Sequence, residues 1–304
     1  MATAPQKAPD TPPKPVAAAP AARRAMAERV SRRPDLSTLA GISLALAGLI
    51  GGLLLERGSI QDIAQITAAM IVLGGTFGAV LVTTPLHVVV YALKRLGDVF
   101  LEFSQPHSAV IDDLIRFAAK ARREGIVSLE HEADAVLDPF MRKALNLAVD
   151  GTDLQELRKM MEIDIAQNEQ AREAEARVWE SAGGYAPTIG IIGAVMGLIQ
   201  VMKHLEDIKE VGHGIAVAFV ATVYGVGSAN IFFLPAANKL RARLREAIAL
   251  QEMVLEGVAS IVEGLNPTLL RLKLEAFDLR REHPKPRAGH AAPPPGPRPA
   301  EPRR

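Results

Sequence analysis

The stretch that decides the fold is LSTLAGISLALAGLIGGLLL, residues 36–55, because it contains no Asp, Glu, Lys or Arg. A helix needs about 20 apolar residues to cross the hydrocarbon layer of a bilayer. Three later blocks, residues 63–93, 181–202 and 211–238, lack the same four residue types. Buried helices of soluble proteins rarely stay free of charge for so long. The pattern predicts an all-α integral membrane protein with four transmembrane helices.

These blocks form two pairs around a long polar segment. Spans one and two occupy residues 36–93, and spans three and four occupy residues 181–238. The insert at residues 94–180 has helical periodicity and is large enough for a small domain. A further helix is expected over residues 239–280.

The two ends of the chain differ in composition from the rest. Residues 1–35 and 281–304 are rich in Pro, Ala and Arg. Such segments cannot bury enough apolar surface to offset the entropy of ordering, so we expect disordered tails. Pro20 interrupts the alanine-rich run near the start, which argues against a secretory signal peptide.

Basic residues near the span ends predict the orientation in the membrane. Arg29, Arg32 and Arg33 precede span one, and Lys94 and Arg95 follow span two. Another basic cluster follows span four. All of them lie on one side if both termini and the insert are cytoplasmic.

The insert begins with two predicted helices. Leu114, Ile115 and Ala118 share the apolar face of the first, which Gly125 is expected to end. The second begins near residue 129, and Asp138-Pro139 interrupts it.

A third helix is predicted to start at Thr152, with a capping box to Gln155. No Gly or Pro occurs between it and Ala182, so the helix is expected to run on into span three. Trp179 and Tyr185 stand where this span enters the membrane and are predicted to be interfacial aromatics.

Several functional classes are excluded by composition and motif. The chain has no cysteine and a formal net charge of +1, which argues against thiol chemistry and nucleic-acid binding. It has no phosphate-binding Gly-x4-Gly-Lys-Ser/Thr loop. His131, Glu132 and Asp134 match no metal-binding spacing and are interpreted as a solvated helix face. We therefore expect no enzyme activity, cofactor or metal.

Spans three and four carry stripes of small residues at helical spacing. Small residues let helix backbones approach closely in lipid, and close packing explains most of them. The stripes are Ala186, Gly190, Gly193 and Gly197 on span three, and Gly214, Ala218, Thr222, Gly225 and Ala229 on span four.

Pro85, Pro187 and Pro235 interrupt spans two, three and four and are expected to kink them. Thr188 and Thr222 add hydroxyl groups to spans three and four, which we expect to line a cavity where polar groups contact an ion. Membrane pathways for protons and cations usually depend on a buried carboxylate, and the four spans contain none. A partner protein is therefore expected to supply the acidic group.

Three separated motifs carry a family resemblance. They are GYAPTIGIIG at residues 184–193, AFVATVYG at residues 218–225 with Pro235 following, and RREGIVSLE at residues 122–130. They resemble the third-span, fourth-span and rotor-contact segments of the MotA/PomA family, flagellar motor stator subunits of the MotA/TolQ/ExbB superfamily. The resemblance covers about residues 36–280. Gly227 departs from it, since an aliphatic residue is usual there.

The resemblance implies a multi-pass subunit of the bacterial inner membrane. Such subunits form a ring, a pentamer, around two copies of a peptidoglycan-anchored MotB-like partner. The membrane helix of that partner carries the aspartate that accepts the ion. Ion passage rotates the ring, and the ring turns the rotor through its switch protein FliG.

By position in the matched motifs, Arg122 and Glu130 would be the charged rotor contacts. Pro187 and Pro235 would couple ion binding to helix movement, and Thr222, with Thr188 on the facing span, would lie near the ion path. From the residues alone, Arg122 and Glu130 are solvated helix-end charges.

The driving ion is expected to be H⁺ rather than Na⁺. Sodium-driven relatives often carry a second threonine just before the position of Thr222, and here that residue is Ala221.

Three other interpretations remain open. An ExbB/TolQ-like energiser of outer-membrane transport typically has three spans, with its large cytoplasmic segment after the first. A structural scaffold would use the glycines and prolines for packing alone. An unrelated transporter is disfavoured by the lack of intramembrane charge and of internal repeats.

Overall fold

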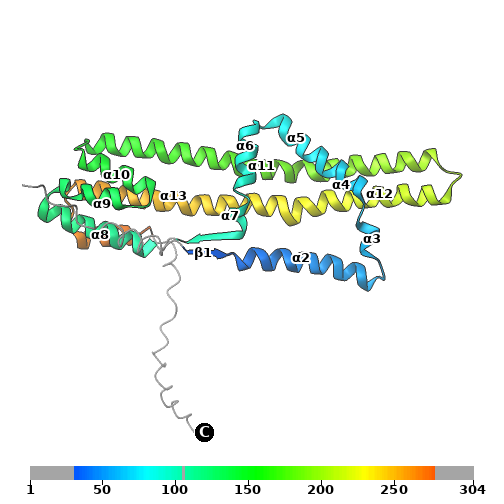
Figure 1. Cartoon of the computed structure of the whole chain (residues 1–304), viewed down its shortest axis with the longest axis horizontal. Coiled ribbons are helices and arrows are strands. Elements are labelled where there is room, and N and C mark those ends of the chain that lie inside the picture. Colours follow the sequence, from blue (N-terminus) through cyan, green and yellow to red (C-terminus); the bar gives the residue numbers. More distant parts are fainter. Residues whose placement is uncertain (1–30, 105–106, 278–304) are drawn as a thin grey trace, which may run out of the picture.

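The computed structural model describes residues 31–104 and 107–277. Within these residues, four helical segments are long and apolar enough to cross a membrane. They are α2 (Leu36–Leu55), the run Ile66–Thr83, and parts of two longer rods, Leu154–Lys203 and Ile208–Val262. The predicted α-helical membrane fold with four spans is confirmed, and Figure 1 shows that the molecule extends along the two rods.

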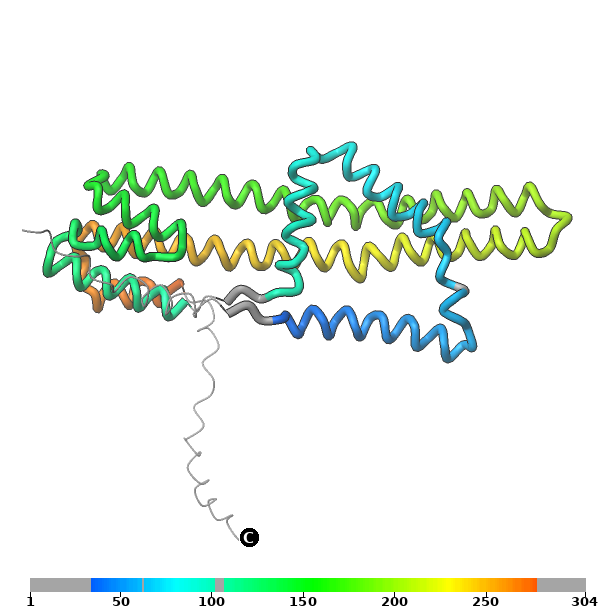
Figure 2. The backbone as a smooth tube through the Cα atoms, viewed as in Figure 1, coloured from blue at the N-terminus to red at the C-terminus, as the bar shows by residue number. Residues whose placement is uncertain are grey.

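The first span stands apart from the rest of the protein. Helix α2 begins after Asp35, whose side chain accepts hydrogen bonds from the amides of Ser37 and Thr38. None of the residues in α2 is buried. Figure 2 shows α2 running beside the rods and leading through α3 (Ile60–Ile63) towards the second span.

The second span is shorter than predicted. It consists of α4 (Ile66–Ala69), η1 (Met70–Gly74) and α5 (Gly75–Thr83), and α6 (Leu86–Lys94) follows at a sharp angle (Figure 1). The expected kink at Pro85 is instead a break between two helices. Proline has no amide hydrogen and disfavours the helical conformation of the preceding residue, and Thr84 is indeed extended.

The two rods run from the membrane segments into a polar domain. Helix α11 (Leu154–Lys203) is continuous over 50 residues, which confirms the predicted extension of the third insert helix into span three. Its cap is not the predicted Thr152. Asp153 accepts the amide of Gln155 at 3.0 Å and so begins the helix.

The second rod consists of three helical segments joined end to end. They are α12 (Ile208–Gly227), η3 (Ser228–Phe233) and α13 (Leu234–Val262). The single helix expected over residues 239–280 is interrupted after α13, because Gly264 adopts a φ of 72° and α14 (Pro267–Glu275) turns back.

The polar domain packs short helices around the outer parts of α11 and α13. These helices are α8 (His107–Glu124), η2 (Ile126–Leu129), α9 (Glu130–Ala135), α10 (Pro139–Val149) and α14. Its core includes the fully buried side chains of Leu114, Phe117 and Leu157. As predicted, Gly125 ends α8, with a φ of 84°, and Pro139 begins a new helix.

One short ladder was not expected in an all-α chain. β1 (Ser31–Pro34) pairs antiparallel with β2 (Leu101–Ser104), which follows α7 (Gly97–Phe100). The predicted disordered tail at residues 1–35 therefore extends too far along the chain, because residues 31–34 form β1. Residues 1–30 and the predicted tail at 281–304 lie outside the described residues.

Candidate functional site

The two small-residue stripes meet where α11 passes α12. A Cβ added at Gly225 would be 2.6 Å from the carbonyl oxygen of Ala186 and 3.0 Å from the Cα of Gly190. Further along, a Cβ at Gly197 would be 2.7 Å from the carbonyl oxygen of Gly214. The predicted close packing is confirmed, and backbone atoms occupy the space between these helices.

Thr188 and Thr222, predicted to lie near the ion path, are not hydrogen-bonded to each other in the described residues. Thr188 is exposed and donates a hydrogen bond to the carbonyl of Tyr185 at 2.8 Å. Thr222 is half-buried and donates to the carbonyl of Ala218 at 3.2 Å. Each hydroxyl bonds its own helix, and its oxygen can still accept a bond from another group.

The predicted coupling prolines lie at neighbouring places on the two rods. Pro187 is inside α11, which continues through it. Pro235 is in the first turn of α13, directly after the π-helical segment η3. Leu234 lies against Gly183, so the start of α13 is beside the turn of α11 that precedes Pro187. Missing or shifted backbone hydrogen bonds make such segments the natural places for a helix to bend.

An aromatic cluster fixes this region to α6. Trp179 is 2% exposed, so its predicted position at the lipid interface is wrong. Its indole nitrogen donates to the carbonyl of Ala92 at 3.3 Å, and its ring stacks on Phe233 with centroids 6.1 Å apart. Phe232 meets the same indole edge to face. The tryptophan therefore ties the first rod to the second rod and to α6.

A buried carboxylate joins the first span to the second rod. Asp35 is 7% exposed and pairs with Lys239 at 2.5 Å and with Arg243 at 2.8 Å. The hydrogen bond from Lys239, helped by that from Ser37, holds the pKa of Asp35 well below its usual range. The sequence analysis missed this clamp, although an acidic residue directly before an apolar run is a typical helix-capping signal.

A second ion pair lies where α6 ends against α11. Arg95 contacts Glu175 at 2.6 Å and Asp98 at 3.6 Å. Burial raises the pKa of Glu175, while the charge of Arg95 opposes that shift. Together with the Asp35 clamp, this pair forms a charged collar just outside the apolar segments, which sequence reasoning also missed.

Arg122 and Glu130, the predicted rotor contacts, lie at the far end of the polar domain. Arg122 is in the last turn of α8 and Glu130 is the first residue of α9, and both are exposed. The intervening η2 is fixed by Lys120, which donates to the carbonyl of Ser128 at 2.9 Å and pairs with Glu132 at 2.6 Å. In the described part of the chain, no ion pair joins Arg122 to Glu130.

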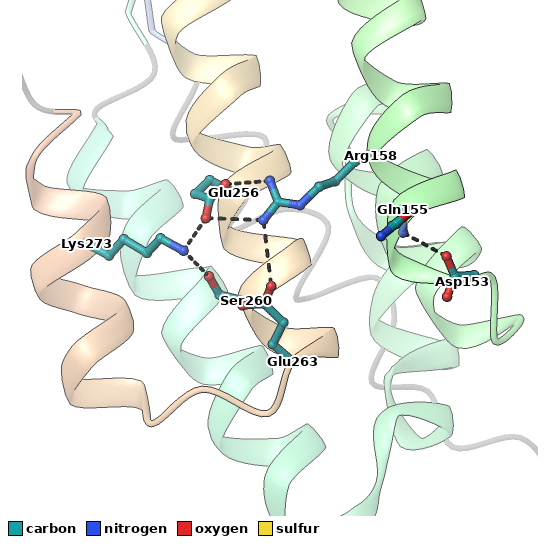
Figure 3. Close-up of polar contacts among 7 residues, drawn as sticks. All are labelled: Asp153, Gln155, Arg158, Glu256, Ser260, Glu263 and Lys273. Atoms are coloured by element: carbon teal, nitrogen blue, oxygen red, sulfur yellow. Dashed lines mark hydrogen bonds and ion pairs between the residues drawn. The ribbon is translucent and has the colours of Figure 1, made fainter.

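A polar network braces this end of the domain (Figure 3). Arg158 on α11 pairs with Glu256 on α13 at 2.7 Å, and Lys273 on α14 reaches the same carboxylate. Lys273 also donates to the hydroxyl of Ser260 at 3.2 Å, and Arg158 lies 3.9 Å from Glu263. Three helices therefore converge on one carboxylate, and the two cations lower the pKa of Glu256.

The described residues contain no group of three or more His, Cys, Asp or Glu side chains that could hold a metal ion. Of His131, Glu132 and Asp134, which were weighed as a metal site in the sequence, Glu132 forms an ion pair with Lys120.

Taken together, the geometry defines a class: a multi-pass α-helical membrane protein whose third and fourth spans extend as rods into a polar domain. Comparison with known proteins makes the assignment specific. The family model described as "MotA/TolQ/ExbB proton channel family" matches residues 132–253, and "Motility protein A N-terminal" matches residues 39–125.

Curated relatives and solved structures agree with these matches. Motility protein A of Bacillus subtilis is 35% identical over 245 residues, covering 79% of this chain and 89% of the relative. Chemotaxis protein PomA of Vibrio alginolyticus is 30% identical, with 80% and 95% covered. "Structure of C. jejuni MotAB" superposes with a TM-score of 0.77 at 33% identity, covering 84% of this chain and all of that one. The MotAB stator complex from Bacillus subtilis gives 0.74 at 33% identity, with 80% and 96% covered.

The chain belongs to the motility protein A family of flagellar stator subunits, within the MotA/TolQ/ExbB proton channel family. It is a multi-pass membrane protein, and the resemblance identified from the three motifs is confirmed.

Proposed function

We propose that this chain, with a MotB-like partner, couples proton flow across the inner membrane to torque on the flagellar rotor. Both termini and the polar domain face the cytoplasm in this proposal, in agreement with the basic residues beside the spans. Five copies form a ring around the partner, and the polar domain contacts the rotor protein FliG. The solved relatives are described as complexes of MotA with MotB, which supports a partnered assembly.

The continuity of the rods carries this proposal. Helix α11 runs unbroken from Lys203 to the outer end of the polar domain, a length of about 75 Å at 1.5 Å per residue. A change of bend at Pro187 is therefore carried to the end of the domain by a single rigid element. The Trp179 cluster holds α6 and the second rod to that element, and the Asp35 clamp holds the first span to the second rod.

The proton path uses groups that the rods present outwards. Thr188 is exposed and Thr222 is half-buried, so both are accessible to a partner helix or a neighbouring subunit. Within the described spans there is no carboxylate, so the ion acceptor comes from the MotB-like partner. Ala221, which replaces the extra hydroxyl of sodium-driven relatives, is buried against Gly193 and favours H⁺.

Deleting the gene tests the function directly. Cells should assemble filaments that do not turn, because only torque is lost. Cells that swim normally but take up nutrients poorly, in a strain with no second stator set, would support an ExbB/TolQ-like energiser instead.

Replacing Pro187 by Leu tests the coupling. The chain should stay in the membrane at its normal level, because leucine fits an apolar helix, while swimming is lost. Pro139→Ala is the matched control, since that proline lies at the start of α10 outside the spans, and it should leave swimming intact. Loss of the Pro187→Leu protein from the membrane would show a folding role instead.

A further inference from the structure

A groove whose side chains are mostly apolar lies at the outer end of the polar domain, beside Arg122. It has a volume of about 330 Å³ and is formed by the end of α8, the turn between α10 and α11, and the end of α13. Its walls include Ala121, Ile126, Thr152, Val262 and Leu265. Among the described residues that line it, Arg122 alone is charged.

Three helix ends explain why this space is hollow. Helices α8, α10 and α13 all end at this place in glycines of positive φ, namely Gly125 (84°), Gly151 (75°) and Gly264 (72°). Glycine provides this conformation without strain, and it leaves no side chain behind. Small side chains, those of Ala118, Ala121 and Ala148, make up more of the lining.

Several backbone carbonyls at the groove already accept hydrogen bonds from turn amides. The amide of Gly151 donates to the carbonyl of Ala148 at 3.3 Å, and that of Gly264 donates to Ile261 at 3.0 Å. The amide of Leu265 similarly donates to Ser260 at 3.0 Å. One lone pair of each of these carbonyls is therefore used, and the side chains around them are mainly Ala, Ile, Val and Leu, so the groove can accept an apolar side chain.

The rim carries a defined charge pattern. Arg122 and Arg123 lie on one side of η2 and Glu130 lies on the other, all exposed. Between them Val127 is 63% exposed, an isolated apolar group among charges. A complementary surface would place a carboxylate opposite the arginines, a cation opposite Glu130, and apolar side chains between them.

We propose that this groove is a socket for a large apolar side chain on a helix of the rotor protein, with an acidic neighbour one turn away that pairs with Arg122. The inference rests on the proposed function and deepens it. Arg122 and Glu130 set the orientation of the approaching helix. Burial of the apolar side chain contributes most of the binding free energy, because exposed ion pairs alone contribute little.

Filling the groove tests the proposal. Ala121→Phe places a ring in the socket without changing any charge, and swimming speed should fall at least fivefold. Ala119→Phe is the matched control, because it lies on the same helix, is also half-buried, and does not line the groove. The control should swim at close to the normal speed. Both proteins should be present in the membrane at the normal level.

A cross-linking experiment separates this inference from the proposed function. A photoreactive benzoylphenylalanine is placed at Thr152 on the groove and, in a second strain, at Glu130 on the rim, in otherwise intact motile cells. The expected cross-link from Thr152 falls on an apolar residue of the rotor protein within one turn of an Asp or Glu.

The outcomes are distinct. If Ala121→Phe swims normally, or if Thr152 cross-links only to another copy of this chain while Glu130 reaches the rotor, the socket is wrong and the stator function stands. If neither position reaches the rotor protein and the deletion strain still swims, the proposed function itself is wrong.

Discussion

The two halves of α11 are held by opposite kinds of packing. In the membrane, Gly190 and Gly197 bring its backbone against that of α12, with no large side chain between them. In the polar domain, Leu157 and Met161 are fully buried among other large apolar residues, and Arg158 adds an ion pair. Water drives the burial of large apolar groups, whereas lipid gives helices no such advantage and leaves close contact as the main attraction. One continuous helix is therefore held by close backbone contact in the membrane and by burial of large side chains in the polar domain.

The largest effect should come from adding one methyl group in the membrane half. In Gly225→Ala the new Cβ would meet the backbone of Ala186, which cannot move aside without separating the two rods. We expect most of the protein to be lost from the membrane and swimming to be abolished, as measured by immunoblot and cell tracking.

Gly227→Ala is the matched control for that change. Nothing lies within 4 Å of a Cβ at this position on the same helix, so the protein level should be unchanged. Equal levels for the two variants would mean that close backbone contact does not hold the rods together.

In the polar half, deletion of a large side chain should be the damaging change. Leu157→Ala leaves a cavity in the core and should cost about 2–5 kcal/mol. The melting temperature of the purified complex should fall by several degrees. Met160→Ala, on the exposed side of the same helix, should change it little. Similar losses for both would show that this core is loosely packed.

The charged collar should give an intermediate effect. Asp35→Asn leaves Lys239 and Arg243 without their carboxylate and should cost about 1–3 kcal/mol. Asp207→Asn is a suitable control, because Asp207 also caps a helix, through the amides of Lys209 and Glu210, but forms no ion pair within the described residues.

The pH dependence of the collar follows from the lowered pKa of Asp35. A depressed carboxyl pKa contributes stability above the usual value of that group, and the contribution is lost as the pH falls through the folded-state value. The difference in melting temperature between wild type and Asp35→Asn should therefore be constant from about pH 8 to 5 and shrink only in stronger acid. A difference that disappears near pH 6 would contradict this assignment.

The smallest effect is expected at the surface. Asp112 pairs with Arg271 at 2.8 Å, and both side chains are largely exposed. Asp112→Asn should change stability by about 0–1 kcal/mol, and less in high salt. A loss as large as that of Leu157→Ala would mean that α14 is held by this pair instead of by its buried leucines.

Much of the site could be predicted because its signals are local. The stripe from Ala186 to Gly197 and the absence of helix breakers before Ala182 are readable along a single helix. Arg122 and Glu130 stand in one continuous motif, and the structure places both on the exposed end of the domain. Their roles in the ion path and at the rotor stay predictions.

The remaining features depend on residues that are far apart in the chain. Asp35 pairs with Arg243, which lies 208 positions later in the chain, and Trp179 bonds to Ala92, which lies 87 positions earlier. Neither contact could be predicted from a local sequence pattern. Tryptophan is a residue type typical of the membrane interface, but the packing of α6 against α11 covers the side chain of Trp179.

By itself, the sequence determined the four spans, the continuity of α11 and the small-residue faces of spans three and four. Each of these depends on hydrophobicity and helical periodicity, which act within one segment. Only the tertiary structure decided which faces meet, which carboxylate is buried, and that three glycine-ended helices leave a groove beside Arg122. Those outcomes depend on where separate helices end in space, and that is set by the packing of all of them at once.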